Sequence, residues 1–364
     1  MASTGNWVLG GLVVMLAAFA LVGPGTANAA GREAKKRAHA SVKPIVVLRN
    51  KQSIVVYAPR RSSARRVASI IEIQPAKPSF GQLYGLHTIS DSLELKSGVA
   101  LILDQDTNEV LFSKNSETVL PIASLTKLMT ALVVTEANQP LDEPITISQD
   151  DVDTEKGSGS RLRVGTQLRR EEMLHLALMS SENRAAHALG RYYPGGLNGF
   201  VAAMNQTARE LGMNDTHYVE PTGLSSQNQS SARDLATLVK AAHEHQIIRD
   251  LSTSHEYQVE VGNRAVQFRN TNGLVRSPLW DIGLQKTGYI SEAGRCLVMQ
   301  ATMAGRQLIM VFLDSAGKYS RIGDAERVRR WITGTPHAAP AGAIPAAAIP
   351  AAAPVNVPVL KLTS

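Results

Sequence analysis

Ser124 and Lys127 lie three residues apart in the apolar stretch 121–134. One turn of helix separates them, so their side chains can share a face. Burial removes water from a charged amine and lowers its pKa, and a neutral lysine can accept the proton of a neighbouring serine hydroxyl. The pair therefore suits nucleophilic catalysis. Taken alone, the same spacing also fits a lysine that extends to solvent.

Two further motifs suit the same chemistry. A Ser-x-Asn motif at 181–183 begins 57 residues after the candidate nucleophile, at a break between two helical patterns. A Lys-Thr-Gly motif at 286–288 begins 103 residues after the end of the second motif, within a strand-like pattern. Each motif occurs often by chance, whereas the ordered trio on a helix, an inter-helix turn and a strand is specific. The trio therefore favours a reactive Lys127.

This trio resembles the signature of the low-molecular-mass penicillin-binding proteins, the D-alanyl-D-alanine carboxypeptidase and endopeptidase family of serine peptidases. Three flanking segments support the resemblance: VALILDQDTNEVLFSKN before the first motif, EPTGLSSQNQSSARDLA between the second and third, and KTGYISEAGRCLV at the third. The resemblance covers about residues 80–333 and is closest to the D-alanyl-D-alanine endopeptidase branch. It implies a β-lactamase/transpeptidase-like fold of the α/β (α+β) class, with an antiparallel sheet flanked by helices.

The resemblance implies a role for each residue of the first two motifs. Ser124 would attack the carbonyl carbon of a D-alanyl amide and form an acyl-enzyme, with Lys127 as its general base. Ser181 would relay a proton toward the leaving nitrogen, and Asn183 would orient the substrate amide.

The third motif would bind the substrate beyond the scissile bond. Lys286 and Thr287 would hold a carboxylate there, and Gly288 would let the strand approach the substrate closely. The backbone N–H groups of the nucleophile and of Tyr289 would form the oxyanion hole. Arg295, on the next strand, is either a second carboxylate contact or an exposed sheet residue.

The function implied is a serine-type endopeptidase that cleaves D-alanyl cross-links in peptidoglycan and is acylated by β-lactam antibiotics. A carboxypeptidase that removes terminal D-alanine uses the same acylation machinery, so the motifs leave both activities open. A catalytically idle, wall-binding scaffold is the alternative from another class, although every catalytic position is intact. We expect no cofactor, no metal and no nucleic acid partner.

Three other features suggest chemistry that we do not assign. Glu220 invites comparison with the deacylating glutamate of class A β-lactamases, but those enzymes carry an asparagine four residues later and this chain has Leu224. We interpret Glu220 as a turn residue and expect slow deacylation of penicillin. His243 and His245 would point to different sides of a helix and lack a third ligand at zinc-site spacing. Cys296 lies in a strand-like run and is predicted to pack in the core.

The patterns around the motifs predict how the fold brings them together. A hairpin pattern at 98–115 precedes a helix at 124–137, and the middle of the chain is helix-rich. Within it, Ser231-x-x-Asp234 resembles a capping box that opens a helical stretch to Ser252. Three strand patterns at 283–290, 295–304 and 306–315 are followed by a last helix. Strands at both ends and helices between them predict one antiparallel sheet with an inserted helical region.

The two ends of the chain differ from this body. Residues 7–22 are mostly apolar and precede the small-residue triplet Ala27-Asn28-Ala29, which predicts a signal peptide at 1–29 and a periplasmic enzyme. An uncleaved membrane anchor is the alternative. Residues 334–364 form an Ala/Pro-rich tail, which we expect to be disordered.

A basic arm is predicted between the signal peptide and the body, at 30–79. Eleven Lys and Arg residues against one Glu give residues 31–66 a net charge of +10. Because the whole chain has a net charge of +7, the residues outside this segment carry −3. Such a run is typical of a solvated arm, and weak contact with anionic membrane or wall polymer is its functional interpretation. A single aromatic residue in this run argues against nucleic acid binding.

Overall fold

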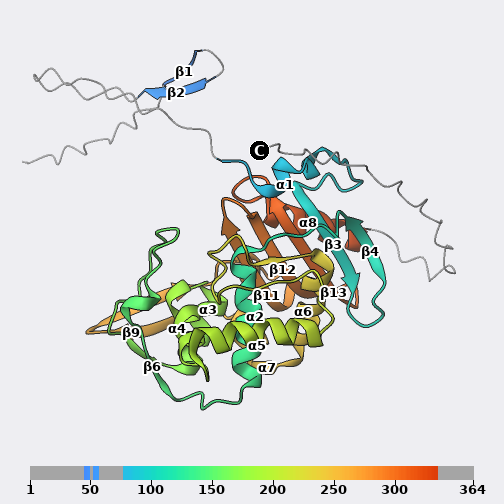
Figure 1. Ribbon diagram of the computed structural model, residues 1–364. Helices are drawn as coiled ribbons and strands as arrows, with labels where there is room; N and C mark the ends of the chain where they lie inside the picture. Colours follow the sequence, from blue (N-terminus) through green and yellow to red (C-terminus); the bar gives the residue numbers. More distant parts are fainter. Residues whose placement is uncertain (1–44, 50–51, 57–76, 335–364) are drawn as a thin grey trace, which may run out of the picture. The chain divides into compact units, whose positions relative to one another are not determined.

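The computed structural model describes residues 45–49, 52–56 and 77–334 of the chain (Figure 1). The predicted signal peptide and all but the first residue of the predicted tail lie outside the described residues. The chain divides into two compact units, 1–74 and 75–364. In the first, β1 (Ile45–Arg49) pairs with β2 (Gln52–Val56) as an antiparallel hairpin, which the charge pattern of the basic arm does not predict.

The second unit contains one five-stranded antiparallel sheet in the order β11-β12-β13-β3-β4 and three small two-stranded pairs. The sheet is built from β3 (Ser97–Asp104), β4 (Val110–Lys114), β11 (Asp281–Ile290), β12 (Gly294–Met303) and β13 (Arg306–Ser315). The pairs are β5 (Leu120–Pro121) with β8 (Gln229–Ser230), β6 (Pro144–Thr146) with β7 (Gln167–Arg169), and β9 (Glu256–Val261) with β10 (Arg264–Arg269).

The helices lie mainly between β4 and β11 in the sequence. They are α1 (Phe80–Leu83), α2 (Thr126–Glu136), α3 (Arg170–Met179), α4 (Asn183–Arg191), α5 (Gly196–Glu210), α6 (Ala232–Glu244), α7 (Gln246–Thr253) and α8 (Ser320–Gly334). Four 3-10 turns accompany them: η1 (Leu86–Thr88), η2 (Ala123–Leu125), η3 (Gln149–Asp151) and η4 (Gly273–Arg276). Among the described residues, none of the helices is both long and apolar enough to span a membrane.

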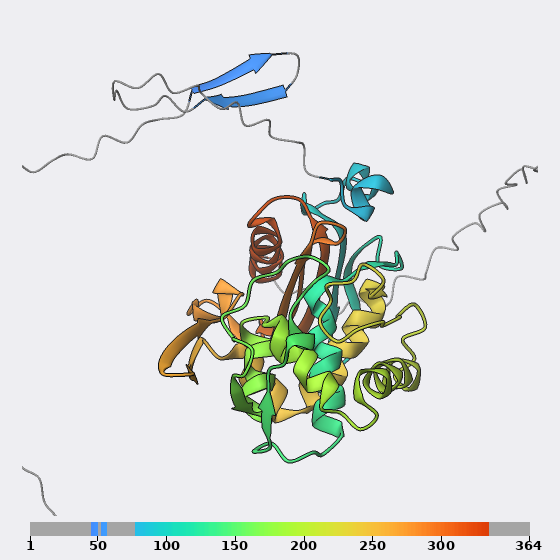
Figure 2. The same ribbon diagram turned by 60° about the vertical axis from the view of Figure 1, so that its left-hand side comes forward.

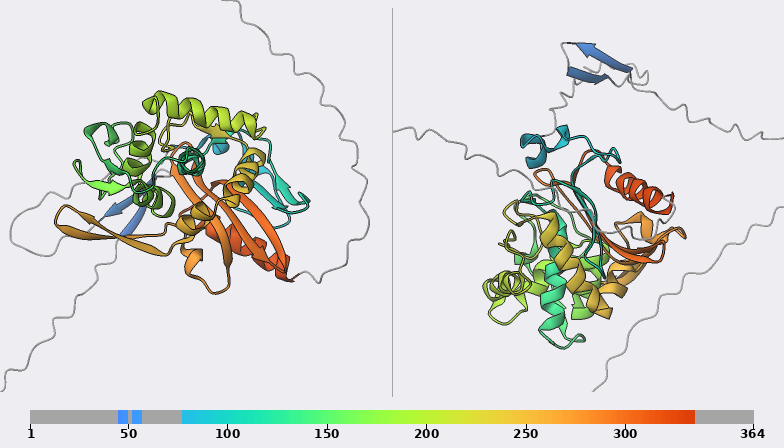
Figure 3. Two further views of the ribbon diagram at one scale, coloured as in Figure 1. Left: turned by 90° about the horizontal axis from the view of Figure 1, so that it is seen from below. Right: turned by 90° about the vertical axis from the view of Figure 1, so that its right-hand side faces the viewer.

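Helices cover both faces of the sheet (Figure 3). Alternate strand residues divide between two cores, because successive side chains in a strand point to opposite faces. Leu101 and Val311 belong to the larger core with the inserted helices, whereas Ile102 and Phe312 belong to the smaller core under α8. Since both faces are buried, the inner strands β3, β12 and β13 carry long apolar runs, whereas the edge strands β4 and β11 also carry polar residues.

The fold prediction is confirmed: N- and C-terminal strands form one antiparallel sheet, and the helical region is inserted between them. The 98–115 hairpin corresponds to β3 and β4, and the three later strand patterns correspond to β11, β12 and β13. The β9–β10 hairpin, which projects beside the helical region, is an element that the patterns do not predict (Figure 2).

Two predicted helices differ in detail from those observed. The helix expected at 124–137 begins as an α-helix only at Thr126, because the preceding residues Ala123–Leu125 form the 3-10 turn η2. The stretch to Ser252 is divided at His245 into α6 and α7. At its start, Ser231 accepts from the Asp234 backbone N–H as expected.

The Asp234 side chain does not complete the capping box. Its carboxylate accepts from the Asp215 backbone N–H at 2.8 Å and from the Thr216 hydroxyl at 2.7 Å, so it holds a distant loop instead of the helix start.

Asp324 fastens α8 to the start of β3. Its carboxylate is fully buried and accepts from the backbone N–H groups of Lys96 and Ser97 at 3.0 and 2.9 Å and from the Ser97 hydroxyl at 2.6 Å. The Arg327 guanidinium lies 2.9 Å away. Removal of this carboxylate would leave several buried donors without partners.

We predict that Asp324→Ala lowers the free energy of unfolding by about 3 kcal/mol, because each buried unsatisfied group costs about 1–3 kcal/mol. Urea unfolding followed by circular dichroism measures the change. Asp142→Ala, at an exposed loop position, is the matched control and should change stability by less than about 0.5 kcal/mol. Equal effects of the two substitutions would contradict the role assigned to Asp324.

Candidate active site

The three motifs come from separate elements and meet beside β11. Ser124 lies in η2 and Lys127 in the first turn of α2, while Asn183 is the first residue of α4. β11, an edge strand of the sheet, carries the Lys-Thr-Gly motif. A Cβ atom added to Gly288 would lie 3.2 Å from the backbone nitrogen of Ser124, so the strand and the η2 turn are in direct contact.

The Lys127 amine lies at the centre of the first two motifs. Its side chain is fully buried, and Nζ lies 3.1 Å from Ser124 Oγ, 2.7 Å from Asn183 Oδ1 and 2.5 Å from the Thr222 carbonyl oxygen. The last two atoms can only accept. A neutral amine can donate its two N–H groups to these two acceptors. Its lone pair can then accept a hydrogen bond from the Ser124 hydroxyl. The geometry therefore suits proton transfer from Ser124 to Lys127.

Burial lowers the pKa of Lys127 to about 8, because the apolar surroundings destabilise the ammonium form. The carboxylates of Glu220 and Glu182 act in the opposite direction and raise the pKa, but less than burial lowers it. A lysine at the surface would keep its charge at neutral pH. Lys127 instead has a neutral fraction near pH 7 that can act as a base.

A second polar pair joins the remaining motifs. Lys286 Nζ donates to Ser181 Oγ at 2.9 Å and to the Thr287 carbonyl oxygen at 2.9 Å. Its side chain is fully buried, and burial, followed by the positive charges of Lys127 and Arg321, lowers its pKa well below the ordinary value. No carboxylate among the described residues pairs with this amine, so a substrate carboxylate would supply the missing counter-charge and favour its ammonium form.

Backbone conformation brings these segments close together. Ala123 and Ser181 have φ of +49° and +61°, a region that residues with a side chain rarely adopt and that is enriched at functional sites. Gly223 faces the first of these positions: a Cβ there would lie 1.9 Å from the Ala123 carbonyl oxygen. Any larger residue would push the nucleophile turn away from the loop that binds Lys127.

Glu220 organises that loop. Its carboxylate accepts from the Thr222 hydroxyl at 2.6 Å, from the Gly223 backbone N–H at 2.6 Å and from Asn228 Nδ2 at 2.9 Å. The turn interpretation of Glu220 is therefore confirmed. The same turn directs the Thr222 carbonyl toward Lys127. The EPTGL segment supported the family resemblance, but its residue types do not reveal this contact.

Three residues of the site were missed by sequence reasoning. Thr222 contributes its carbonyl, and Ser158 Oγ accepts from Asn183 Nδ2 at 2.8 Å, which fixes the orientation of that amide. Arg321, from α8, donates from Nη1 to the Gly288 carbonyl oxygen at 3.3 Å. Its Nε atom is buried without a hydrogen-bond partner among the described residues. A backbone carbonyl is common to every residue, and Arg321 is far from the motifs in the sequence. Contacts of these two kinds therefore produce no recognisable motif.

Tyr289 and Arg295 lie outside this polar centre. The two residues are opposite each other in the β11–β12 register. The guanidinium carbon of Arg295 lies 4.4 Å from the centre of the Tyr289 ring. The tyrosine side chain is exposed, so both residues border the solvent side of β11. The buried side-chain contacts join five of the nine predicted site residues, namely Ser124, Lys127, Ser181, Asn183 and Lys286. The Thr287 hydroxyl lies 2.7 Å from that of Thr271, and Gly288 has no side chain.

The other candidate groups belong elsewhere. Cys296 is fully buried in the core as predicted, and burial raises the pKa of its thiol to about 12. His243 contacts Gln105 and His245 contacts Glu136, so the two imidazoles have separate partners. In the described part of the chain, no three His, Cys, Asp or Glu side chains form a cluster that could hold a metal.

Comparisons with known proteins agree with the motifs and the geometry. A family model for D-alanyl-D-alanine carboxypeptidase, peptidase S11, matches residues 87–317. A D-alanyl-D-alanine endopeptidase of Pseudomonas aeruginosa is 50% identical over 253 residues, covering 69% of this chain and 82% of that protein. One from Escherichia coli is 45% identical over 260 residues, covering 71% and 84%.

The fold also matches a solved structure. The Streptomyces K15 DD-transpeptidase superimposes with a TM-score of 0.62 and 27% identity, covering 66% of this chain and 98% of that one. The resemblance predicted from the three motifs is thus confirmed at the level of sequence and of fold. The chain belongs to the peptidase S11 family of D-alanyl-D-alanine carboxypeptidases.

Proposed function

We propose that this protein is a serine-type D-alanyl-D-alanine endopeptidase that cleaves D-alanyl cross-links in peptidoglycan. The observation that carries the proposal is the buried Lys127 amine, 3.1 Å from Ser124 Oγ and held by two further acceptors. Two relatives of this chain are named D-alanyl-D-alanine endopeptidase. This similarity favours cross-links over chain ends as the substrate that we propose for this protein.

Acylation begins when Ser124 Oγ attacks the D-alanyl carbonyl carbon and its proton passes to neutral Lys127. The carbonyl oxygen becomes an oxyanion, which the backbone N–H groups of Ser124 and Tyr289 stabilise; such donors contribute about 3–4 kcal/mol. The C–N bond then breaks, and the proton moves from Lys127 through the Ser181 hydroxyl to the leaving amine. Asn183 holds the amide of the acyl-donor peptide during this step.

Deacylation reverses these roles. Water attacks the ester carbonyl, Lys127 accepts its proton, and the proton returns to Ser124 Oγ as the ester bond breaks. Penicillin would acylate the same serine, and its ester would persist because no glutamate in the described site is placed to activate water as in class A β-lactamases. Glu220, the sequence candidate for that role, is engaged by its own loop.

The residue beyond the scissile bond carries a carboxylate in both candidate substrates. In a terminal D-Ala-D-Ala it is the chain end, and in a cross-link through a diamino acid it is the free α-carboxylate. Lys286 and Thr287 would bind it, with Arg321 adding positive charge from the far side of Gly288. These residues therefore support both endopeptidase and carboxypeptidase action.

We place the enzyme in the periplasm, because peptidoglycan is its substrate and residues 1–29 have the pattern of a signal peptide. The basic arm would add weak attraction to anionic membrane or wall polymer. The idle-scaffold alternative requires that the buried Lys127 and its three partners have no catalytic use, although burying this amine carries a free-energy cost on the order of 3 kcal/mol.

We predict that labelled penicillin adds its mass to the peptide that contains Ser124, and that Ser124→Ala abolishes the adduct. Mass spectrometry of the digested protein makes the measurement. The same wild-type protein should convert purified cross-linked muropeptide dimers into monomers. Loss of a single D-alanine from pentapeptides, with dimers left intact, would instead identify a carboxypeptidase. An adduct that survives Ser124→Ala would refute the acyl-enzyme.

We predict that the second-order rate constant for penicillin acylation rises with pH, with its midpoint near pH 8. Below that pH Lys127 is mainly protonated, and about one molecule in ten carries the neutral base at pH 7. Stopped-flow measurements from about pH 6 to about pH 9.5 test the profile. The control Lys127→Ala should show no acylation at any pH while its thermal unfolding midpoint stays near that of the wild type. A flat wild-type profile would exclude Lys127 as the base.

A further inference from the structure

Thr271 lies in the loop between β10 and η4 and contacts the third motif, although none of the three motifs includes it. Its hydroxyl oxygen lies 2.7 Å from the hydroxyl oxygen of Thr287. Thr271 is exposed, whereas Thr287 is buried, with 4% of its surface exposed. The two hydroxyls therefore meet where the proposed leaving-group site opens to solvent.

The backbone of Thr271 contacts the segment that carries the second motif. Its N–H group donates to the Met179 carbonyl oxygen at 3.1 Å. Met179 is the last residue of α3 and lies two positions before Ser181, whose hydroxyl accepts from Lys286. The end of α3 and the turn that follows it are thus connected to β11 twice, once through Lys286 and once through Thr271. The position of Thr271 is therefore fixed relative to both motifs.

Two buried asparagines, Asn270 and Asn272, fix the loop on either side of Thr271. The Asn270 amide donates from Nδ2 to the Ser252 carbonyl oxygen at 2.9 Å. Its Oδ1 atom accepts from Gln285 Nε2 at 3.0 Å and from the Asn272 backbone N–H at 2.9 Å. Buried polar groups require hydrogen-bond partners, so these contacts favour a single arrangement of the loop. The Thr271 hydroxyl is consequently held beside β11 by the backbone.

The Thr287 hydroxyl can bind a substrate carboxylate in one way only. A hydroxyl carries a single proton, and an ionised carboxylate only accepts hydrogen bonds, so Thr287 must donate its proton to the carboxylate. Its oxygen can then accept from Thr271 but cannot donate to it. Among the described residues, Thr271 provides the one side chain that is hydrogen-bonded to this hydroxyl. With substrate bound, Thr271 is therefore the donor of the pair.

We propose that Thr271 is a positioning residue of the leaving-group site: its hydroxyl donates to Thr287 and directs the Thr287 proton at the carboxylate beyond the scissile bond. This inference rests on the proposed function, because it concerns the substrate carboxylate assigned to Lys286 and Thr287. Thr271 acts through Thr287 and makes no contact of its own with the carboxylate. The loop that carries Thr271 is fixed against β11 and α3, so its hydroxyl is in place before substrate binds.

Two physical effects give Thr271 its influence on carboxylate binding. A hydroxyl proton has three staggered orientations, and a donor at the Thr287 oxygen disfavours those in which the Thr287 proton points at Thr271. Hydrogen bonds in a chain also polarise one another, so the bond from Thr287 to the carboxylate becomes stronger when Thr287 itself accepts. The first effect is limited by the number of orientations and the second to a fraction of one hydrogen bond. We therefore expect loss of the Thr271 hydroxyl to weaken the site about three- to fivefold.

The test measures acylation by penicillin, whose carboxylate is joined to the lactam nitrogen through one carbon, as in the leaving amino acid. In the full-length chain, Thr271→Val removes the hydroxyl and keeps the branched shape. We expect the second-order rate constant, measured by stopped flow, to fall about three- to fivefold. Thr271→Ser keeps the hydroxyl and should retain the wild-type value. In a Thr287→Val background, Thr271→Val should have no further effect, because a positioning residue acts only through the group that it positions.

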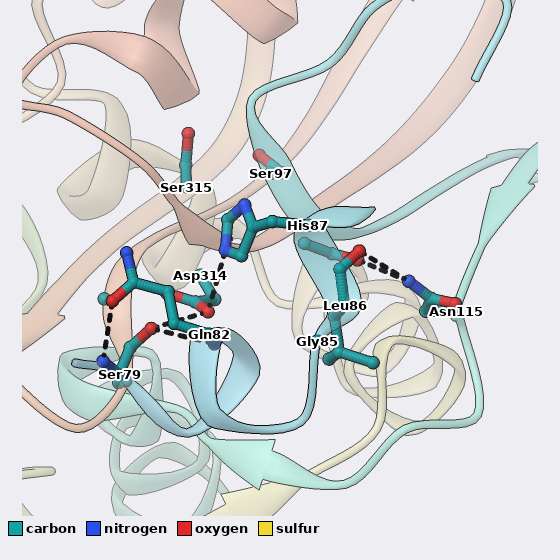
Figure 4. Close-up of polar contacts among 12 residues, drawn as sticks. Ser79, Gln82, Gly85, Leu86, His87, Ser97, Asn115, Asp314 and Ser315 are labelled. Atoms are coloured by element: carbon teal, nitrogen blue, oxygen red, sulfur yellow. Dashed lines mark hydrogen bonds and ion pairs between the residues drawn. The ribbon is translucent and has the colours of Figure 1, made fainter. Parts of the chain in front are cut away.

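The control removes a hydroxyl from a different hydrogen-bonded pair. Ser79 Oγ donates to Asp314 Oδ2 at 2.8 Å, a contact that Figure 4 shows, and Ser79→Ala should leave the rate constant near the wild-type value. An unchanged rate in Thr271→Val, an equal loss in Thr271→Ser, or the same loss in the Thr287→Val background would overturn the proposal. Failure of the proposed function is distinguishable, because it would appear as wild-type protein that forms no Ser124 adduct or leaves dimers uncut.

Discussion

The burial of one amine sets the main constraint on this structure. Lys127 has no access to solvent, so its charged form is unstable and its pKa falls to about 8. The protein tolerates the buried amine because Asn183, Thr222 and Ser124 surround Nζ with hydrogen-bond partners. Each partner comes from a different element, and each element has its own support, such as the Glu220 turn beneath the Thr222 carbonyl. The free-energy cost of burial and the capacity for proton transfer therefore have one cause.

The sheet provides the rigid frame against which these elements meet. Helices cover both of its faces, and α8 is fastened to β3 through the buried Asp324 carboxylate. β11 is left as an edge strand, and its Gly288 allows contact with the turn that carries the nucleophile. Two residues of the segments that approach this edge, Ala123 and Ser181, have positive φ angles, which are strained for residues with a side chain. A stable frame thus supports a locally strained site.

The candidate site combines a buried polar centre with a border that faces solvent. The groups suited to proton transfer are buried, where their pKa values can be shifted by desolvation. Tyr289 and Arg295 instead face the solvent side of β11, where the guanidinium carbon stands 4.4 Å from the centre of the ring.

The sequence by itself determined the family, the order of elements and the identity of the central residues. Motif order, apolar periodicity and turn residues are local properties, so they predicted β3, β4, β11, β12 and β13 and placed Ser124 near Lys127. Only the tertiary structure showed that the Thr222 carbonyl and Arg321 reach the site, that a 3-10 turn precedes α2, and that the Ser79 hydroxyl donates to Asp314, more than 200 residues away. These features depend on contacts between distant segments and on backbone atoms that every residue shares, so residue type and spacing do not encode them visibly.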